Sequence, residues 1–144
     1  MNFQYDYPRP AVTVDVILIS NSNPVKILLI KRLRDPFAGF WALPGGFVDE
    51  QEDLMNAALR ELEEETQITG VSLTQFKTYG TPHRDPRGHV VSVVFFGKVD
   101  ENIHFCAADD AAEAQWFALN QLSSLAFDHG QIIDEFVKAK LELD

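Results

Sequence analysis

Apolar residues gather first in two strand-like segments near the start of the chain. Residues 11–20 (AVTVDVILIS) and 25–34 (VKILLIKRLR) are rich in β-branched and aliphatic side chains, which favour β-strands. The cluster Asn-Ser-Asn-Pro at 21–24 between them is a turn signal. The pattern therefore predicts an antiparallel pair of strands joined by a short turn.

Further along, extended and helical segments alternate. Asp35-Pro36 ends the second strand, and residues 40–43 predict a short extended piece that runs into the corner Pro44-Gly45-Gly46. Good helix formers, with neither Gly nor Pro among them, predict a helix from about Glu50 to Thr66. Three further strands are expected at 73–79, 90–99 and 114–118, followed by an amphipathic helix over 130–141.

This order of elements predicts an α/β fold, an α/β/α sandwich in which helices flank a mixed β-sheet. The chain has 144 residues and 46% hydrophobic content, and no repeat, low-complexity tract or linker divides it. A chain of this size can bury one continuous core. We therefore expect a single domain over residues 1–144.

The predicted helix at 50–66 carries a cluster of carboxylates. On a helical wheel at about 100° per residue, Glu61, Glu64 and Glu65 fall within an arc of roughly 100°. Ala58 and Leu62 occupy the adjoining arc, so one side of the helix can pack on the sheet while its edge presents three carboxylates. Like charges at these spacings repel each other, and a bound cation would remove that repulsion.

Two interpretations of these carboxylates compete. A charge run is usually a solvated helix face with lateral ion pairs, and the helix taken alone favours that interpretation. The alternative is a site for a hard divalent cation, which prefers oxygen ligands.

The formal net charge of -10 argues against nucleic acid as a partner, because such binding relies on Lys and Arg. An acidic protein that acts on phosphates needs a cation between its carboxylates and the substrate.

The spacing of the surrounding residues favours the cation site. Gly46 is followed after five residues by Glu52, and after seven more by Arg60-Glu61-Leu62-x-Glu64-Glu65. This segment resembles the signature of the Nudix hydrolases at each charged position. With residue frequencies of about 5–7%, six such matches have a chance probability on the order of 10⁻⁷.

The resemblance implies a role for each of these residues. In the family, the metal ion, Mg²⁺ or Mn²⁺, polarises a diphosphate and helps to position or ionise the attacking water. Residues that support the site orient it through an ion pair and hydrogen bonds. The matching metal ligands are the carbonyl of Gly45 and the carboxylates of Glu61, Glu64 and Glu65, and the supporting residues are Arg60 and Glu52. Gln67 departs from the family pattern, which has glycine there to end the helix, so we expect the helix to end nearer Gly70.

The resemblance extends from about Tyr5 to His129 and is greatest to the Nudix branch that contains bacterial ADP-ribose pyrophosphatases. It implies cleavage of ADP-ribose to AMP and ribose 5-phosphate. One alternative is a hydrolase of nucleoside triphosphates or of other nucleoside diphosphate derivatives. Another is a non-catalytic ADP-ribose sensor, although such sensors usually carry a DNA-binding domain, for which 144 residues leave no room.

Residues outside the glutamate helix are further candidates. Glu113, just before the strand expected at 114–118, is either another carboxylate at the metal, as ligand or general base, or a surface residue. Arg84 and Arg87 either contact the diphosphate or the terminal ribose, or form salt bridges. Arg9 is a weaker candidate for stacking on the adenine, with a core or interface role favoured.

The remaining features concern location and assembly. The N-terminus lacks a basic segment followed by an apolar one, and no window is long enough to cross a membrane, so we expect a cytoplasmic protein with no membrane partner. Cys106, the only cysteine, permits no intrachain disulfide and is expected to be buried. Relatives in this branch commonly pair through their N-terminal segments, which implies a homodimer with residues 1–10 as a candidate arm.

Overall fold

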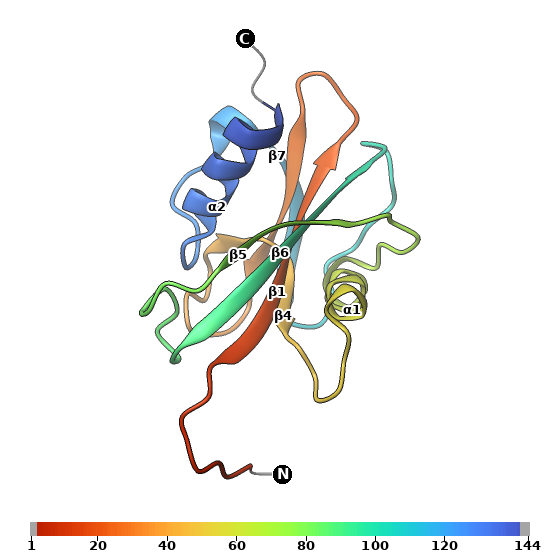
Figure 1. Cartoon of the computed structure of the whole chain (residues 1–144). Coiled ribbons are helices and arrows are strands. Elements are labelled where there is room, and N and C mark those ends of the chain that lie inside the picture. Colours follow the sequence, from red (N-terminus) through yellow and green to blue (C-terminus); the bar gives the residue numbers. More distant parts are fainter. Residues whose placement is uncertain (1–2, 142–144) are drawn as a thin grey trace.

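A mixed seven-stranded sheet with helices on both faces forms the body of the molecule in the computed structural model, which describes residues 3–141 (Figure 1). The strands, in chain order, are β1 Ala11–Ser20, β2 Lys26–Arg32, β3 Trp41–Ala42, β4 Gly45–Phe47, β5 Thr74–Tyr79, β6 Val90–Val99 and β7 Ala111–Ala118. The helices are α1 Leu54–Thr66 and α2 His129–Phe136, with short helical turns at Leu119–Gln121 and Val137–Leu141.

The centre of the sheet is a long parallel pair, β1 and β6, which stay in register from Ala11↔Val90 to Ser20↔Val99. The strand order is β3-β2-β1-β6-β5, with β4 added to β1 and β7 added to β2. β1 and β2 form the expected antiparallel pair, but their register includes only Ile19↔Ile27. Beyond this point β4 pairs with β1 and β3 pairs with β2, so the sheet opens between the two strands.

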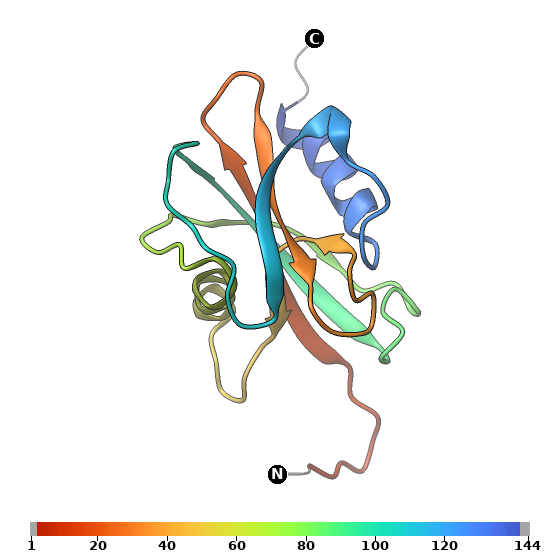
Figure 2. The ribbon, with the colours of Figure 1, turned by 180° about the vertical axis from the view of Figure 1, so that it is seen from behind.

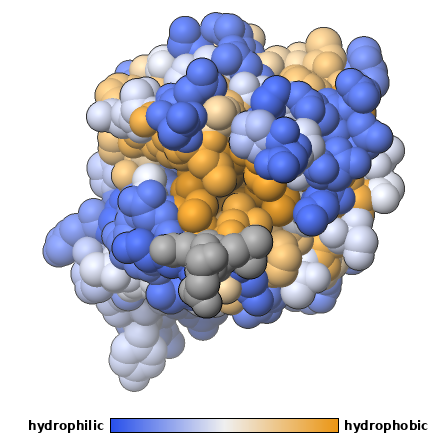
Figure 3. Space-filling view, turned by 90° about the horizontal axis from the view of Figure 1, so that it is seen from above, coloured by the Kyte–Doolittle hydropathy of each residue, from blue (hydrophilic) through white to orange (hydrophobic). Residues whose placement is uncertain are grey.

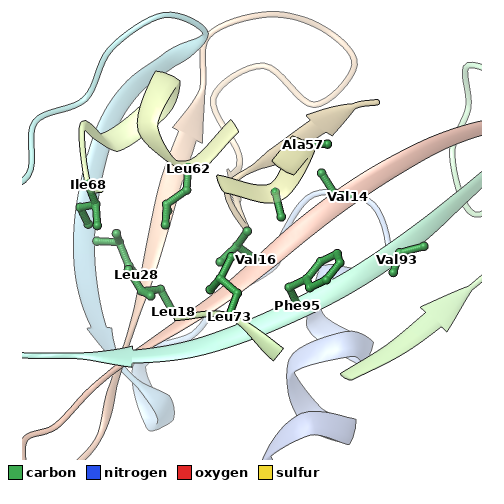
Figure 4. Close-up of a cluster of buried hydrophobic side chains, with 11 residues drawn as sticks. Val14, Val16, Leu18, Leu28, Ala57, Leu62, Ile68, Leu73, Val93 and Phe95 are labelled. Carbon is green, nitrogen blue, oxygen red and sulfur yellow. The ribbon is translucent and has the colours of Figure 1, made fainter. Parts of the chain in front are cut away.

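Each face of the sheet has its own hydrophobic core, because alternate residues of a strand point to opposite faces. On the α1 face, Val14 and Val16 of β1 pack with Leu62 of the helix (Figure 4). On the α2 face, Ile17 packs with Ile132. β1 is therefore buried on both faces, as its nearly continuous apolar sequence requires.

Both ends of α1 differ from the sequence expectation. The helix begins at Leu54 rather than near Glu50, because the Asp53 carboxylate caps it by accepting the backbone N–H groups of Met55 and Asn56. It ends at Thr66, and the expected extension toward Gly70 is wrong. Gln67 takes the left-handed conformation itself, with φ 65°, although it is not glycine.

Three other expectations also need correction. β7 begins at Ala111, so Glu113 lies within the strand and not before it. The expected helix at 130–141 is regular only to Phe136 and continues as a π-helical turn. Cys106 is exposed, since the irregular segment that carries it lies on the surface beside the end of α1.

An extended arm precedes β1 and projects away from the sheet in both ribbon views (Figures 1 and 2). Phe3, Tyr5 and Tyr7 on this arm are 51%, 52% and 79% exposed. The opposite end of the molecule presents an apolar area ringed by hydrophilic side chains (Figure 3). Within residues 3–141, no helix is long and apolar enough to span a membrane.

Candidate active site

The corner at Gly45 and Gly46 brings β4 very close to both β1 and α1. A Cβ atom on Gly46 would lie 2.6 Å from the carboxylate carbon of Glu61, and one on Gly45 would lie 2.5 Å from a carboxylate oxygen of Asp15. Position 45 requires glycine because a Cβ there would also overlap the backbone of β1, and a side chain at position 46 would displace the Glu61 carboxylate. The corner is therefore a cradle in which the Glu61 carboxylate lies directly against the backbone.

Glu65 enters the same corner from the buried side of α1. It is 5% exposed, and its Oε1 accepts the Gly45 N–H at 2.8 Å. Burial raises the pKa of this carboxyl to about 8; the bond from Gly45 opposes the shift, and the nearby Glu61 adds to it. Burial also raises the pKa of Glu61, against the pull of Arg60. Without a cation, the corner therefore disfavours two ionised carboxylates.

Arg60 connects the carboxylates along the outer edge of α1. Its Nε and Nη2 donate to the two oxygens of Glu52 at 2.7 and 2.9 Å. Its Nη1 donates to Glu61 at 2.8 Å and to Glu64 at 3.2 Å, and Nη2 also reaches the Phe47 carbonyl at 3.1 Å. The bonds from Arg60 lower the pKa of Glu52 to about 2, so this pair stays charged. Arg60 thus ties the helix to the loop that follows β4.

The donors at this edge fit a divalent cation. Among residues 3–141, no three His, Cys, Asp or Glu side chains are gathered closely enough to hold a metal as they stand. The available donor atoms are nevertheless hard oxygens, which suit Mg²⁺ or Mn²⁺. They belong to the carboxylates of Glu61, Glu64 and Glu65 and to the carbonyl of Gly45. A cation would also favour the ionised form of the two buried carboxylates, which the fold alone disfavours.

A crevice runs from this corner into the opening between β1 and β2. Its outer cleft, of about 330 Å³, is lined by Gly45, Gly46, Glu61, Glu65, Arg32 and Arg87 among others. Its inner cavity, of about 40 Å³, has room for a few water molecules and ends at Asp15, Arg84, Asp85 and His129. Ligand groups larger than water therefore have space in the outer cleft.

Two arginines line the same outer cleft as Glu61 and Glu65. The guanidinium of Arg87 lies 4.5 Å from the ring centre of Phe47 and 5.2 Å from that of Phe127, and it pairs with Asp85 at 2.7 Å. The guanidinium of Arg32 lies 5.0 Å from the same Phe127 ring. Burial, and then the positive charge of Arg87, lower the pKa of Arg32. Two neighbouring cations of this kind are suited to an anionic ligand.

Of the other candidates, Arg84 lies deep in the crevice and is already paired. Its side chain is 4% exposed and binds Asp128 through two hydrogen bonds, of 2.6 and 2.9 Å. Burial opposes its charge, but Asp128 outweighs this and raises the pKa of Arg84. Salt bridging, the alternative weighed for Arg84 from the sequence, describes this geometry.

Glu113 and Arg9 are not brought to the crevice. The Glu113 carboxylate is 56% exposed and lies 3.4 Å from the Lys31 ammonium on the neighbouring strand. Arg9 lies on the projecting arm, with its guanidinium 4.0 Å from the ring centre of Tyr5. Neither residue lines the crevice found in residues 3–141.

Four crevice residues were not predicted as site residues from the sequence: Asp15, Arg32, Phe127 and His129. Asp15 interrupts an apolar strand, and a buried charge in such a position is a usable hint. Arg32 is one of several basic residues near the end of β2 and has no distinguishing spacing. The opening between β1 and β2 brings these four together, and it depends on strand pairing that the sequence pattern does not encode.

Fold and site together describe an α/β protein in which a carboxylate-bearing helix edge, a glycine corner and a pair of arginines line one cleft. The model of the NUDIX domain matches residues 9–139, and the chain therefore belongs to the Nudix family. The predicted family and the predicted mixed sheet flanked by helices are both confirmed. Members of this family generally use divalent metals.

Similar proteins include enzymes and a regulator. An ADP-ribose pyrophosphatase of Methanocaldococcus jannaschii is 46% identical over 93% of this chain and 77% of its own length. The ADPR responsive transcriptional repressor NtrR of Acinetobacter baylyi is 38% identical over 90% of this chain, which spans about half (54%) of that repressor. The NUDIX domain of Shewanella oneidensis NrtR, solved with ADP ribose, superposes with a TM-score of 0.86 at 32% identity, covering 94% of this chain and 93% of that one.

Proposed function

We propose that this protein is a metal-dependent pyrophosphohydrolase of nucleoside diphosphate derivatives and that its substrate is ADP-ribose. Water adds across the diphosphate, one P–O bond breaks, and the products are AMP and ribose 5-phosphate. The similarity to the archaeal ADP-ribose pyrophosphatase supports the choice of substrate, as does the ADP ribose bound to the NrtR domain.

One observation carries the proposal: the partly buried carboxylate of Glu61 and the buried carboxylate of Glu65 line one cleft together with Arg32 and Arg87. A diphosphate needs cations on both sides, since it carries negative charge on both phosphates. The arginines supply positive charge on one side. The carboxylates supply the ligands for a cation on the other.

Each residue of the site has a distinct task in this proposal. A divalent metal, when bound, would supply the positive charge that polarises the diphosphate and helps to ionise water. The ligands of this metal are the carboxylates of Glu61, Glu64 and Glu65 and the carbonyl of Gly45. Arg60 and Glu52 fix the orientation of the carboxylates through the bonds described above. Arg32 and Arg87 orient the phosphates, for which planar guanidinium groups are well suited. Either Mg²⁺ or Mn²⁺ satisfies the hard oxygen donors.

The experiment that tests this function is a substrate panel. ADP-ribose, NADH, a nucleotide sugar and nucleoside triphosphates are incubated with the full chain and either Mg²⁺ or Mn²⁺, and the products are identified by chromatography. We expect AMP and ribose 5-phosphate from ADP-ribose, at the highest kcat/KM of the panel. Nucleoside monophosphate and inorganic pyrophosphate from a triphosphate, at higher kcat/KM, would instead support the triphosphate alternative.

A second candidate function is a sensor that binds ADP-ribose without hydrolysing it. The 38% identity to a transcriptional repressor that responds to ADPR favours it. The complete set Arg60, Glu61, Glu64 and Glu65 favours turnover. Calorimetry separates the two: a sensor binds ADP-ribose and leaves it intact in the presence of Mg²⁺ or Mn²⁺, whereas the hydrolase consumes it.

We further propose that residues 1–144 form one domain and that two copies associate through the arm at residues 1–10. The exposed aromatic side chains of Tyr5 and Tyr7 support this, because they have apolar area to bury. Sedimentation analysis is expected to give a dimer for the natural chain and a monomer for the Tyr5→Ser, Tyr7→Ser double variant.

A further inference from the structure

The two backbone amides that flank Pro44 are each held by an ionisable side chain. Pro44 itself has no N–H group. The Gly45 N–H donates to Glu65 of α1 at 2.8 Å, and the Leu43 N–H donates to Nδ1 of His129 of α2 at 3.0 Å. The two helices lie on opposite faces of the sheet, so the corner is held from both sides (Figure 1).

The chain just before α2 aligns His129 with the corner. Leu125 forms a parallel bridge with Trp41, and the Ala126 N–H donates to the Trp41 carbonyl at 2.9 Å. This short segment therefore extends along the edge of β3. Leu43 lies two residues after Trp41, just beyond β3. There the imidazole of His129, and not a backbone carbonyl, accepts the N–H group.

His129 is buried and is held in one tautomer. It is 3% exposed, and because its Nδ1 accepts a hydrogen bond, the proton of the neutral ring lies on Nε2. Nε2 lies 3.6 Å from Oδ1 of Asp15, whose other oxygen accepts the Ser92 hydroxyl at 2.5 Å. A carboxylate on this side favours the tautomer that leaves Nδ1 free to accept.

We infer that His129 is a positioning residue for the metal-binding corner: by accepting the Leu43 N–H, it fixes Gly45 and, through the Gly45 N–H, the carboxylate of Glu65. This inference rests on the proposed function, in which Gly45 and Glu65 are metal ligands. His129 touches neither metal nor substrate in this arrangement. It acts through Leu43, much as residues behind metal ligands fix their orientation.

The test compares two substitutions that differ in whether they keep the acceptor. His129→Asn places an amide oxygen at the same number of bonds from the backbone as Nδ1, whereas His129→Leu keeps bulk and removes the acceptor. Affinity for Mn²⁺ alone is measured by calorimetry on the full chain, beside KM, kcat and Tm. We expect a loss of Mn²⁺ affinity of about 10-fold or more for His129→Leu and recovery to within about 3-fold for His129→Asn.

Ile132→Ala is the matched control, because Ile132 is a fully buried residue of the same helix that packs in the core away from the corner. It is expected to lower Tm and leave Mn²⁺ affinity unchanged. Equal loss of Mn²⁺ affinity in His129→Leu and Ile132→Ala, or no recovery in His129→Asn, would overturn the inference. If His129→Leu fails to fold, His129→Phe provides the second comparison, with the same expected loss of Mn²⁺ affinity because it keeps a ring but removes the nitrogen that accepts the Leu43 N–H; unchanged affinity there would also overturn the inference.

Failure of the proposed function gives a different result. In that case the natural chain binds Mn²⁺ but leaves ADP-ribose intact, and the affinities of the His129 variants still test the positioning role.

Discussion

Glu65 links the stability of the metal-free fold to the binding of the cation. Its folded-state pKa of about 8 lies above its ordinary value of 4.5, so the fold retains a proton that the unfolded chain has already lost. The contribution of this group to stability is therefore present below about pH 4.5 and is lost as the pH rises through about 8. A cation must displace the same proton to bind the carboxylate.

This linkage predicts that Mn²⁺ affinity increases with pH. Between about pH 6 and about pH 8, the affinity is expected to rise by up to tenfold per pH unit, with release of about one proton per ion bound. Calorimetry in buffers of different ionisation enthalpy measures both quantities. Glu65→Gln is the control, and its weaker binding should lack most of this pH dependence. A flat profile in the natural chain would contradict the raised pKa.

Arg60 holds Glu52, Glu61 and Glu64 together, and its removal leaves these carboxylates without an ordered partner. We predict that Arg60→Ala lowers kcat/KM for ADP-ribose by about 10–100-fold. Arg60→Lys should recover little of the loss, because one ammonium cannot supply the separate donors of the guanidinium group. The exposed neighbour Glu63 provides the control, and steady-state kinetics of Glu63→Ala should match the natural chain. Normal activity in Arg60→Ala would remove Arg60 from the site.

Arg32 tests the opposite wall of the cleft. Arg32→Ala is expected to raise KM for ADP-ribose by about tenfold or more, since a hydrogen bond to a charged group contributes about 1.5–3 kcal/mol. Mn²⁺ affinity without substrate should stay unchanged, because Arg32 is not a ligand. A loss of Mn²⁺ affinity equal to the change in KM would place Arg32 in the metal site instead.

At the residue scale, the sequence identified the glutamate helix because its spacing is a local property of one segment. It could not identify Arg32 or His129, which reach the crevice through strand pairing and through the segment before α2. It also nominated Glu113 and Arg9, which the structure places outside the crevice. Charge and proximity along the chain do not report which face of a strand a side chain occupies.

At the scale of elements, the end of α1 shows how a helix can stop without the expected glycine. Gln67 adopts a left-handed φ of 65° and its N–H donates to the Glu63 carbonyl. The carbonyls of Glu65 and Thr66 accept the N–H groups of Ala108 and Cys106 from the segment that leads to β7. Tertiary contacts therefore satisfy the helix end, and these contacts are not visible in the sequence of the helix itself.

This conformation predicts that Gln67→Gly stabilises the protein. Glycine adopts positive φ without the steric penalty of a Cβ atom, so the free energy of unfolding is expected to rise by about 0.5–1 kcal/mol. Denaturant titration measures the change. Glu63→Gly, at an exposed position inside the same helix, should instead lower it by about 1 kcal/mol. A Gln67→Gly variant less stable than the natural chain would show that the Gln67 side chain stabilises the fold in another way.

Strand positions were predictable where apolar runs are long. They were less predictable where a segment becomes a strand only by pairing with a neighbouring strand. β1 and β6 have the bounds expected from their apolar runs. The short β4, which carries Gly45 and Gly46, was expected as a corner, and it becomes a strand by pairing with β1 at Asp15↔Gly45. That pairing opens the sheet and creates the crevice, a feature of topology and not of local pattern.

At the scale of the whole molecule, β1 joins two cores that lie on opposite faces of the sheet. Leu62 belongs to one core and Ile17 to the other, and both are fully buried. We predict that Leu62→Ala and Ile17→Ala each lower the free energy of unfolding by about 2–5 kcal/mol. Each variant should still unfold in one transition by circular dichroism and by fluorescence, as a single domain requires. Two separate transitions would contradict the proposed single domain.

The whole-molecule charge of -10 makes a bound cation essential to the account, because an acidic protein and a diphosphate repel each other. The most direct test follows ADP-ribose turnover by the natural chain and by Glu61→Gln, with Mg²⁺ or Mn²⁺ and after chelation, while circular dichroism monitors folding. The account predicts AMP and ribose 5-phosphate from the metal-loaded natural chain, with turnover reduced by orders of magnitude in Glu61→Gln or in chelator and the fold retained. Near-normal hydrolysis in either condition would contradict it.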